Sequence, residues 1–345
     1  MMVIGIDAHK RSHTAVSVDE MGRQGFVKTV GTTTHDHLRL LKWAAGFAEK
    51  RLWAIEDCRH LTRRLERDLI AAGESVVRVS PKLMAHMRDS ARSYGKSDPI
   101  DALAVARAAL REPDLPIARL DGIEREIRLL VDHREDLVAE RTRIIARLRW
   151  HLHELDPGWS APTKLERLSA FDKVHAYPSG EKHGAMVRRL ALRLVEHLRL
   201  LTDEIDELTV EITARVTAIA PSLLAIVGCG ALSAAKIIGE TAHAGRFRSK
   251  DAYARHNGTA PLPVWSSNKQ RHRLSRTGNR QLNAALHRIA MTQARCYPPA
   301  RDLLERRKNN GDGGMEGLRI LKRRLSDVVY RAMLADQTGQ PAVAA

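Results

Sequence analysis

Val3-Ile4-Gly5-Ile6-Asp7 is a short apolar run that ends in a carboxylate, a pattern typical of a buried β-strand. Residues 13–18 and 25–30 continue this pattern on either side of a turn, so the first 30 residues predict a meander of three strands. Beyond it, helix and strand patterns alternate over residues 35–49, 52–56, 61–72 and 75–79. This alternation predicts a mixed α/β sheet layered with helices.

The chain becomes helical after Ser80-Pro81. Asp98-Pro99 predicts an N-cap followed by proline at the first position of a helix over residues 100–110. Two amphipathic runs follow, over residues 123–155 and 187–212, and the second carries a coiled-coil seam of apolar residues spaced three and four apart: Val187, Leu190, Leu194, Leu198, Leu201, Ile205, Leu208 and Ile212. The turn-rich segment between them favours an antiparallel hairpin within the chain, and pairing between protomers is the alternative.

From Pro221 onward the chain is basic and punctuated by glycines. The turn Val227-Gly228-Cys229-Gly230 between apolar segments resembles a helix-hairpin-helix, in which backbone amides approach a phosphate, and a purely structural turn is the alternative. We therefore predict an α/β domain over residues 1–118, a helical coiled-coil region over 119–218, a mostly helical basic domain over 219–336 and a disordered tail over 337–345. The predicted fold class is α/β plus all-α.

The positive charge is concentrated in the last third of the chain. Lys and Arg number 57 against 41 Asp and Glu, a net charge of +16. Residues 1–120 contribute +5 and residues 121–218 contribute −2, whereas residues 219–335 hold 21 basic and 7 acidic side chains. Such an excess favours a polyanionic partner. No run of about 20 apolar residues is present to span a membrane, and charged residues from Asp7 to Arg11 interrupt any signal sequence, so we expect a cytoplasmic protein.

Four carboxylates form the most informative pattern. Asp7 and Glu56 each close a predicted strand, and Asp98 and Asp101 lie three residues apart on the first turn of a predicted helix, which places them on one face. Carboxylates gathered without adjacent cations repel one another unless hard divalent ions neutralise them. A pair of Mg²⁺ ions in such a cluster suits in-line displacement at phosphorus.

Gly-Ile-Asp-Ala-His-Lys at residues 5–10, Ile-Glu-Asp at 55–57 and Lys-Ser-Asp-Pro-Ile-Asp-Ala at 96–102 resemble the DEDD tetrad of the RuvC-like, ribonuclease-H-fold domain of the IS110 family of insertion-sequence transposases. Arg-Phe-Arg-Ser at 246–249, Asn-Gly-Thr-Ala-Pro at 257–261 and the block 271–280 resemble the C-terminal transposase domain of that family. The resemblance covers nearly the whole chain.

The resemblance implies that Asp7, Glu56, Asp98 and Asp101 bind the metal and that a serine attacks DNA phosphorus. Ungapped counting from the flanking blocks places this serine at Ser266. The family commonly has glycine after it, whereas Ser267 stands here and is the second choice. The neighbouring cations expected to hold phosphates are Lys269, Arg271, Arg273, Arg276 and Arg280.

The resemblance further implies recombination of donor and target double-stranded DNA under guidance from a structured non-coding RNA encoded beside the gene. The seam and the need to hold two duplexes favour a homodimer or homotetramer. The alternative function is a metal-dependent RuvC-like nuclease or junction resolvase in which water attacks and Ser266 is inert. His9 lies two positions past Asp7, so it could face the site, but the expected role is that of an exposed turn residue.

Overall fold

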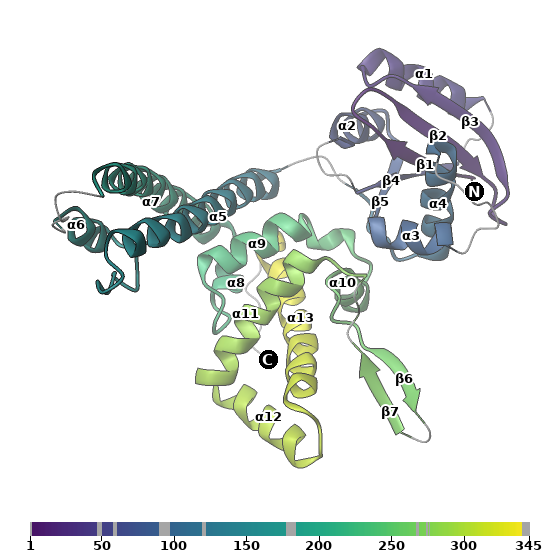
Figure 1. Ribbon diagram of the computed structural model, residues 1–345. Coiled ribbons are helices and arrows are strands. Elements are labelled where there is room, and N and C mark those ends of the chain that lie inside the picture. Colours follow the sequence, from purple (N-terminus) through teal and green to yellow (C-terminus); the bar gives the residue numbers. More distant parts are fainter. Residues whose placement is uncertain are drawn as a thin grey trace. The chain divides into compact units, whose positions relative to one another are not determined.

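The computed structural model describes residues 2–46, 50–57, 61–89, 97–118, 122–176, 184–266, 269–273, 275 and 277–339. Contacts divide the chain into two units, one of Met1–Gly122, Ile226–Gly228 and His243–Ala345, and one of Ile123–Ala225 and Cys229–Ala242. The first unit contains an α/β domain and a mostly helical domain, and the second is helical (Figure 1). The predicted fold class of α/β plus all-α is confirmed.

The N-terminal domain is a five-stranded sheet with helices on both faces. Its elements are β1 (Met2–Ala8), β2 (His13–Val18), β3 (Gln24–Val30), α1 (Thr34–Ala45), β4 (Arg51–Glu56), α2 (Arg63–Ala71), β5 (Ser75–Val79), α3 (Pro81–Asp89) and α4 (Asp98–Arg111). The strand order is β3-β2-β1-β4-β5, with an antiparallel meander from β1 to β3 and with β4 and β5 parallel to β1. The predicted meander and the alternation after it are therefore present.

The two-residue period of β1 assigns its side chains to opposite faces of the sheet. Ile4 and Ile6 pack with Leu40 of α1 and Leu65 of α2 in one buried cluster. Val3 packs on the other face with residues of α4. Gly5 and Asp7 share the period of Val3, so the face that carries the carboxylate is the face that α4 covers.

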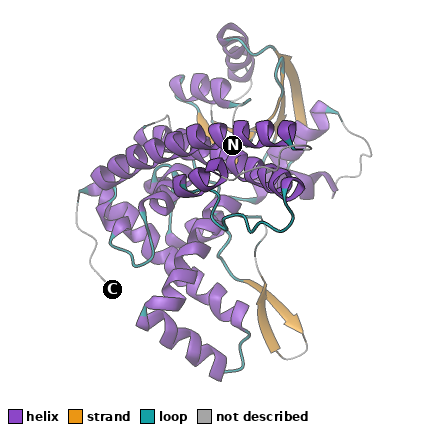
Figure 2. Ribbon diagram, turned by 60° about the vertical axis from the view of Figure 1, so that its left-hand side comes forward, coloured by secondary structure: helices purple, strands orange, loops and turns teal. Residues whose placement is uncertain are grey.

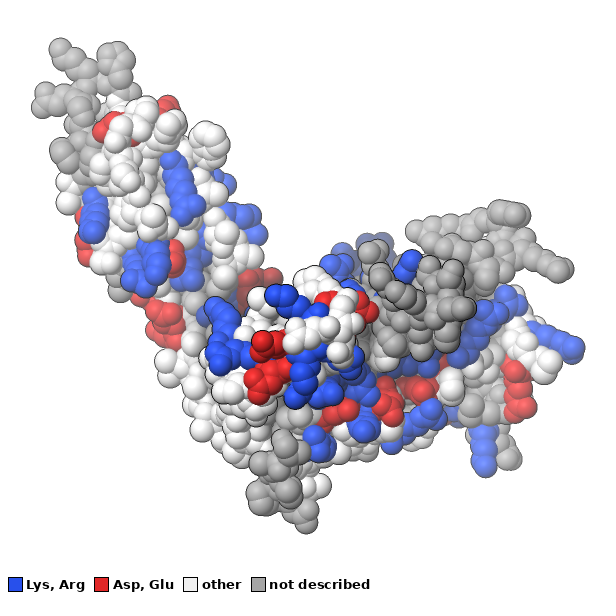
Figure 3. Space-filling view, turned by 90° about the horizontal axis from the view of Figure 1, so that it is seen from below, with Lys and Arg blue, Asp and Glu red and all other residues white. Residues whose placement is uncertain are grey.

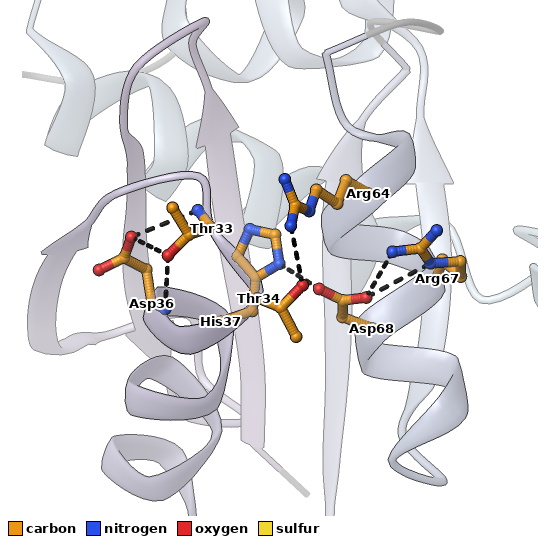
Figure 4. Close-up of polar contacts among 7 residues, drawn as sticks. All are labelled: Thr33, Thr34, Asp36, His37, Arg64, Arg67 and Asp68. Atoms are coloured by element: carbon orange, nitrogen blue, oxygen red, sulfur yellow. Dashed lines mark hydrogen bonds and ion pairs between the residues drawn. The ribbon is translucent and has the colours of Figure 1, made fainter.

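Helices α1 and α2 are joined by a partly buried hydrogen bond (Figure 4). His37 of α1 is fully buried, and its Nδ1 lies 2.7 Å from Oδ2 of Asp68 in α2. Burial acts to raise the pKa of Asp68, but hydrogen bonds from His37, Arg67 and Thr34 outweigh it and lower the pKa. A second buried imidazole, His13 of β2, lies with its ring centroid 5.4 Å from that of His37.

We expect His13 to make the α/β domain sensitive to acid. Burial and the neighbouring His37 and His9 lower the pKa of His13 from 6.5 to about 4. The unfolded chain therefore binds a proton at higher pH than the folded chain, and stability falls as pH drops from 6.5 toward 4, by at most about 3 kcal/mol. Urea unfolding between these pH values measures the slope, and His13→Gln, which does not titrate, should flatten it. An unchanged slope in that variant would contradict the assignment.

The second unit is built on two long helices. Its elements are α5 (Ile123–Leu155), α6 (Leu168–Ala176), α7 (Ala185–Ile219), α8 (Pro221–Leu224) and α9 (Ala231–Thr241). The ion pair Glu126–Arg215 and the hydrogen bond Arg141–Thr202 show that α5 and α7 run antiparallel within one chain. Pairing between protomers stays a prediction.

The buried face of α7 follows the predicted seam only in part. Leu198, Leu201, Ile205 and Ile212 are buried, but Leu190 is 41% exposed. Ala191 and Val195 are buried there instead, in a cluster with Phe171 of α6. The short helix α6, which the sequence pattern did not reveal, packs on α7 and so shifts its buried face.

The C-terminal domain consists of helices and one hairpin of two strands. Its elements are η1 (Ala244–Arg246), α10 (Lys250–His256), β6 (Leu262–Ser266), β7 (Lys269–Arg273), α11 (Arg280–Cys296), α12 (Pro298–Asn309) and α13 (Gly314–Thr338). Leu321, Leu325 and Val329 recur every four residues on the buried face of α13, which packs against α11. Figure 2 shows the hairpin as the only strands drawn in this domain.

Three details of the structure were not anticipated from the sequence. The C-terminal domain is mostly helical, as expected, but it also contains the strands β6 and β7. Ser97, not Asp98, is the N-cap of α4, so Asp98 begins the helix. Helix α13 continues to Thr338, beyond the start of the expected tail at residue 337, while residues 340–345 lie outside the described residues. Among the helices that the structure describes, none has the length and apolar character that a membrane crossing needs.

Candidate functional site

The four carboxylates lie at one end of the sheet and at the start of α4. Ile6 of β1 pairs with Ile55 of β4 in parallel register, so Asp7 and Glu56 are the next residues on two adjacent strands. Asp98 and Asp101 occupy the first turn of α4, which packs on β1. Asp7 and Asp101 are 5% and 8% exposed, whereas the side chain of Asp98 is half exposed.

Gly5 allows α4 to cross β1 at backbone contact. A Cβ atom added at Gly5 would lie 2.1 Å from the carbonyl oxygen of Ala102 and 2.5 Å from the nitrogen of Ala106. Only glycine leaves room for this approach. The first turn of α4 is thereby held next to the end of β1, where Asp7 stands.

We expect Gly5→Ala to displace α4 and destabilise the domain by about 1–3 kcal/mol, because its methyl group meets backbone atoms that a side-chain rotation cannot move. Urea unfolding measures this loss. Gly314→Ala is a matched control, since a Cβ atom at Gly314 meets nothing within 4 Å. Equal stability of the two variants would show that α4 is not seated as described.

The four acids act on one another electrostatically. Burial raises the pKa of Asp7, His9 opposes this rise, and the negative charges of Asp101, Glu56 and Asp98 raise the pKa further. No Lys or Arg pairs with Asp7 or Asp98 in the described ranges of the chain. The cluster therefore holds closely spaced negative charge that a divalent cation would neutralise.

His9 lies in the turn after β1 and its side chain is 49% exposed, as expected, and it also faces this cluster. Its Nε2 lies 3.1 Å from Oδ2 of Asp7 and 3.4 Å from Oδ1 of Asp98. One ligand atom from each of Asp7, His9 and Asp98 lies within 4.8 Å of the others, which makes these three a possible metal site. The spacing Asp-x-His after a strand was the available signal, because alternate residues of an extended chain share a face.

The candidate nucleophile closes a strand of the C-terminal hairpin. Ser266 is the last residue of β6, and its backbone pairs with Lys269 of β7. The side chains of Ser266, Lys269 and Arg271 are not described, and Ser267 and Arg276 lie outside the described residues. Arg273 and Arg280 are exposed. The structure thus places the backbone of Ser266 at a hairpin tip, and its role stays a prediction.

Two glycines allow the backbone segments at the base of this hairpin to lie in close contact. A Cβ atom at Gly278 would lie 2.3 Å from the nitrogen of Gly258, and Gly258 has a positive φ of 72°. The backbone N–H of Asn279 donates to the carbonyl of His256 at 2.7 Å. The two segments that enter and leave the hairpin therefore cross at van der Waals contact.

A buried polar network, which the sequence analysis missed, supports this crossing. Asn257 is fully buried, and its Nδ2 donates to Oγ of Ser326 on α13 at 2.7 Å. Asn283 of α11 donates to the carbonyl of Asn257 and accepts from Nζ of Lys322 at 2.6 Å. The hairpin is thus anchored to α11 and α13.

Two segments of the sequence match known protein families. Residues 4–157 match the family described as "Transposase" of the DEDD IS110 type, and residues 220–305 match "Transposase IS116/IS110/IS902 family". The chain belongs to the IS110 family of transposases. It is accordingly an enzyme that cleaves and rejoins DNA.

The curated relatives of this transposase are insertion-element proteins of similar length. The IS116 44.8 kDa protein of Streptomyces clavuligerus is 27% identical over 383 residues, which cover 97% of this chain and 94% of the relative. The IS900 42 kDa protein of Mycobacterium paratuberculosis is 26% identical, with 96% and 95% covered. Both are described as uncharacterized, so they add the family and no residue roles.

Among solved structures, the transposase is similar to RuvC of Thermus thermophilus. One structure of RuvC with a Holliday junction substrate has 16% identity and a TM-score of 0.27, and covers 34% of this chain and 99% of RuvC. Another RuvC structure has 17% identity and a TM-score of 0.28, and covers 34% of this chain and 100% of RuvC.

Proposed function

We propose that this transposase cuts and rejoins donor and target double-stranded DNA with Mg²⁺ held by Asp7, Glu56, Asp98 and Asp101 and with Ser266 as the nucleophile. The observation that carries the proposal is the gathering of these acids: burial raises the pKa of Asp7, and the negative charges of the other three raise it further. Carboxylate oxygens are the ligands that Mg²⁺ prefers. When bound there, Mg²⁺ would neutralise charge on the reacting phosphate.

The serine step exchanges one phosphodiester for another. The Oγ of Ser266 bonds to a DNA phosphorus, the bond from that phosphorus to the leaving deoxyribose oxygen breaks, the serine proton passes to a nearby base, and the leaving oxygen takes up a proton. A hydroxyl of the incoming strand reverses the exchange and releases the serine. The steps consume neither water nor an oxidant, so the energy of the broken bond is kept for rejoining.

We further propose that an element-encoded non-coding RNA guides the reaction and that the transposase acts as a homodimer or homotetramer. A guide that pairs with DNA leaves the protein to contact mainly phosphates, which is consistent with a chain of 4% aromatic residues and net charge +16. Lys and Arg are spread over the face seen in Figure 3, with Asp and Glu between them. Cations such as Lys269, Arg271, Arg273, Arg276 and Arg280 would hold these phosphates.

The test is expression of the transposase from a plasmid that carries the element with its native flanks. We expect an RNA derived from these flanks to co-purify, and recombined junctions to be recovered only when that RNA is present. Recombination that persists after the flanking sequence is deleted would exclude the guide RNA.

The alternative of a nuclease or junction resolvase rests on the same four acids, because a metal site can activate water as well as a serine hydroxyl. In that reaction water attacks and no bond forms between protein and DNA. A denaturing gel of the transposase with radiolabelled flanking DNA separates the two, because a serine nucleophile leaves labelled protein. Cleavage without labelled protein would exclude the serine mechanism.

A further inference from the structure

The C-terminal domain contains a cavity of about 330 Å³ at the base of the hairpin. Residues 258–261, which lead into β6, form one wall, Arg273 and Ser275 at the end of β7 form another, and the first turns of α13 with Arg307 of α12 complete it. Ala260, Pro261 and Ile320 contribute apolar surface. The volume lies at the lower end of the range for small-ligand sites.

Positive charge dominates the lining. Six cations face the cavity, Arg273, Arg307, Arg319, Lys322, Arg323 and Arg324, against the single carboxylate of Glu316. Arg307 pairs with Asp312, and Arg323 pairs with Asp251 and Asp327. In the part of the chain that the structure describes, no ion pair involves Arg273, Arg319 or Arg324.

Lys322 is a buried cation for which the described residues provide no carboxylate partner. The residue is 7% exposed, and its Nζ donates to the neutral amide oxygen of Asn283. Burial lowers the pKa of Lys322, and the nearby Arg319 lowers it further. A bound anion would supply the counter-charge that this ammonium group lacks, at little cost in reorganisation because Asn283 already holds the group in place.

We propose that this cavity receives one unpaired nucleotide of a nucleic-acid strand, with its phosphate on Arg319, Lys322 and Arg324 and its base against Ala260, Pro261 and Ile320. A paired duplex keeps its bases stacked inside and would offer the cavity only phosphates, whereas an extruded or single-stranded nucleotide offers both parts. The inference rests on the proposed function, which supplies the nucleic acid. DNA and RNA strands share the chemistry that the cavity recognises.

The cavity would read a nucleotide at a defined distance from the cleaved bond. From Pro261, which precedes β6, to Ser266 at its end, the chain spans about 17 Å at 3.3–3.4 Å per residue. That length corresponds to about five stacked nucleotides at 3.4 Å each. With Ser266 as the proposed nucleophile, the occupant is a flanking nucleotide rather than the one that is cut.

Fluorescence anisotropy of the full chain with labelled single strands tests the proposal, with one arm of DNA and one of RNA. We expect Arg319→Ala and Arg324→Ala each to weaken binding about tenfold in at least one arm. Each should also flatten the slope of log binding constant against log salt concentration by about 0.7 for every phosphate that the arginine neutralises in the wild type. The arm that responds identifies the strand. Arg331→Ala, which removes an exposed cation of the same helix, is the matched control and should change binding less than twofold.

A second variant tests whether the free volume of the cavity, and not only its positive charge, is needed for binding. Ala260→Leu fills the cavity and keeps every cation, so it should also weaken binding, while Ala284→Leu on the exposed surface of α11 should not. Melting curves check that each variant is folded. Equal binding by Ala260→Leu and wild type, or equal losses in Arg319→Ala and Arg331→Ala, would overturn the proposal. The anisotropy assay measures binding and does not require cleavage. A transposase in which Ser266 is not the nucleophile could therefore still bind a nucleotide in the cavity. Conversely, loss of the cavity proposal would not exclude the serine mechanism.

Discussion

Asp7→Asn should lower DNA cleavage about a thousandfold while making the protein more stable in the absence of divalent ions. The loss follows because a metal site contributes several kcal/mol of charge stabilisation to phosphoryl transfer, and each 1.4 kcal/mol is a factor of ten. The gain follows because burial and the charges of Asp101, Glu56 and Asp98 raise the pKa of Asp7, with only His9 opposing them. The ionised form is thus disfavoured in the folded state, and a neutral amide of the same size removes that penalty.

Two measurements check this pair of effects. Thermal melting in EDTA should show a higher midpoint for Asp7→Asn than for wild type, and added Mg²⁺ should raise the midpoint of wild type but not of the variant. Asp68→Asn is a control on the opposite face of the sheet. It should destabilise the fold, because it removes the charge that His37 and Arg67 contact, and it should keep the response to Mg²⁺. An Asp7→Asn variant that still responds to Mg²⁺ would place the metal elsewhere.

Ser266→Ala should abolish cleavage, by about four orders of magnitude or more, and leave nucleic-acid binding within twofold of wild type. The expectation follows because removal of a covalent nucleophile stops the chemical step, whereas the phosphates are held by neighbouring cations. Labelled protein on a denaturing gel and strand cleavage are measured together. Anisotropy with the same DNA measures binding.

Ser267→Ala is the matched control for the nucleophile, since it removes the same hydroxyl one residue away. Ser267 lies outside the described residues, and it is the second choice for the nucleophile. We expect full labelling by Ser267→Ala. The reverse pattern, with labelling abolished only in Ser267→Ala, would move the nucleophile by one position.

Much of the α/β domain was readable from local pattern. The apolar run that begins at Val3 and the strand Ser75–Val79 lie where alternation and turn residues predicted them, because strand periodicity and breakers act over a few residues. The C-terminal hairpin was missed. Its strands contain Pro263 and the basic run 269–273, residues with low strand propensity. The position of the hairpin depends on the close backbone contact between Gly258 and Gly278 at its base.

The candidate site shows the same division. The order of Asp7, Glu56, Asp98 and Asp101 along predicted elements was sufficient to nominate them, and two of them lie at the ends of adjacent strands because parallel strands end at one edge. Their approach to α4 depends on Gly5, whose missing Cβ admits the backbone at Ala102. The position of His9 beside Asp7 and Asp98 depends on the conformation of the turn after β1.

The sequence by itself determined the family, the sheet of the first domain, the four acids and the basic C-terminal third, because these are written in local periodicity, motif and charge. Only the tertiary structure decided that α4 lies against Gly5, that His9 faces Asp7, and that Lys322 and its neighbouring arginines enclose a cavity beneath the hairpin. The physical reason is that close backbone approach and buried charge depend on contacts between residues far apart in the chain, which no local pattern records.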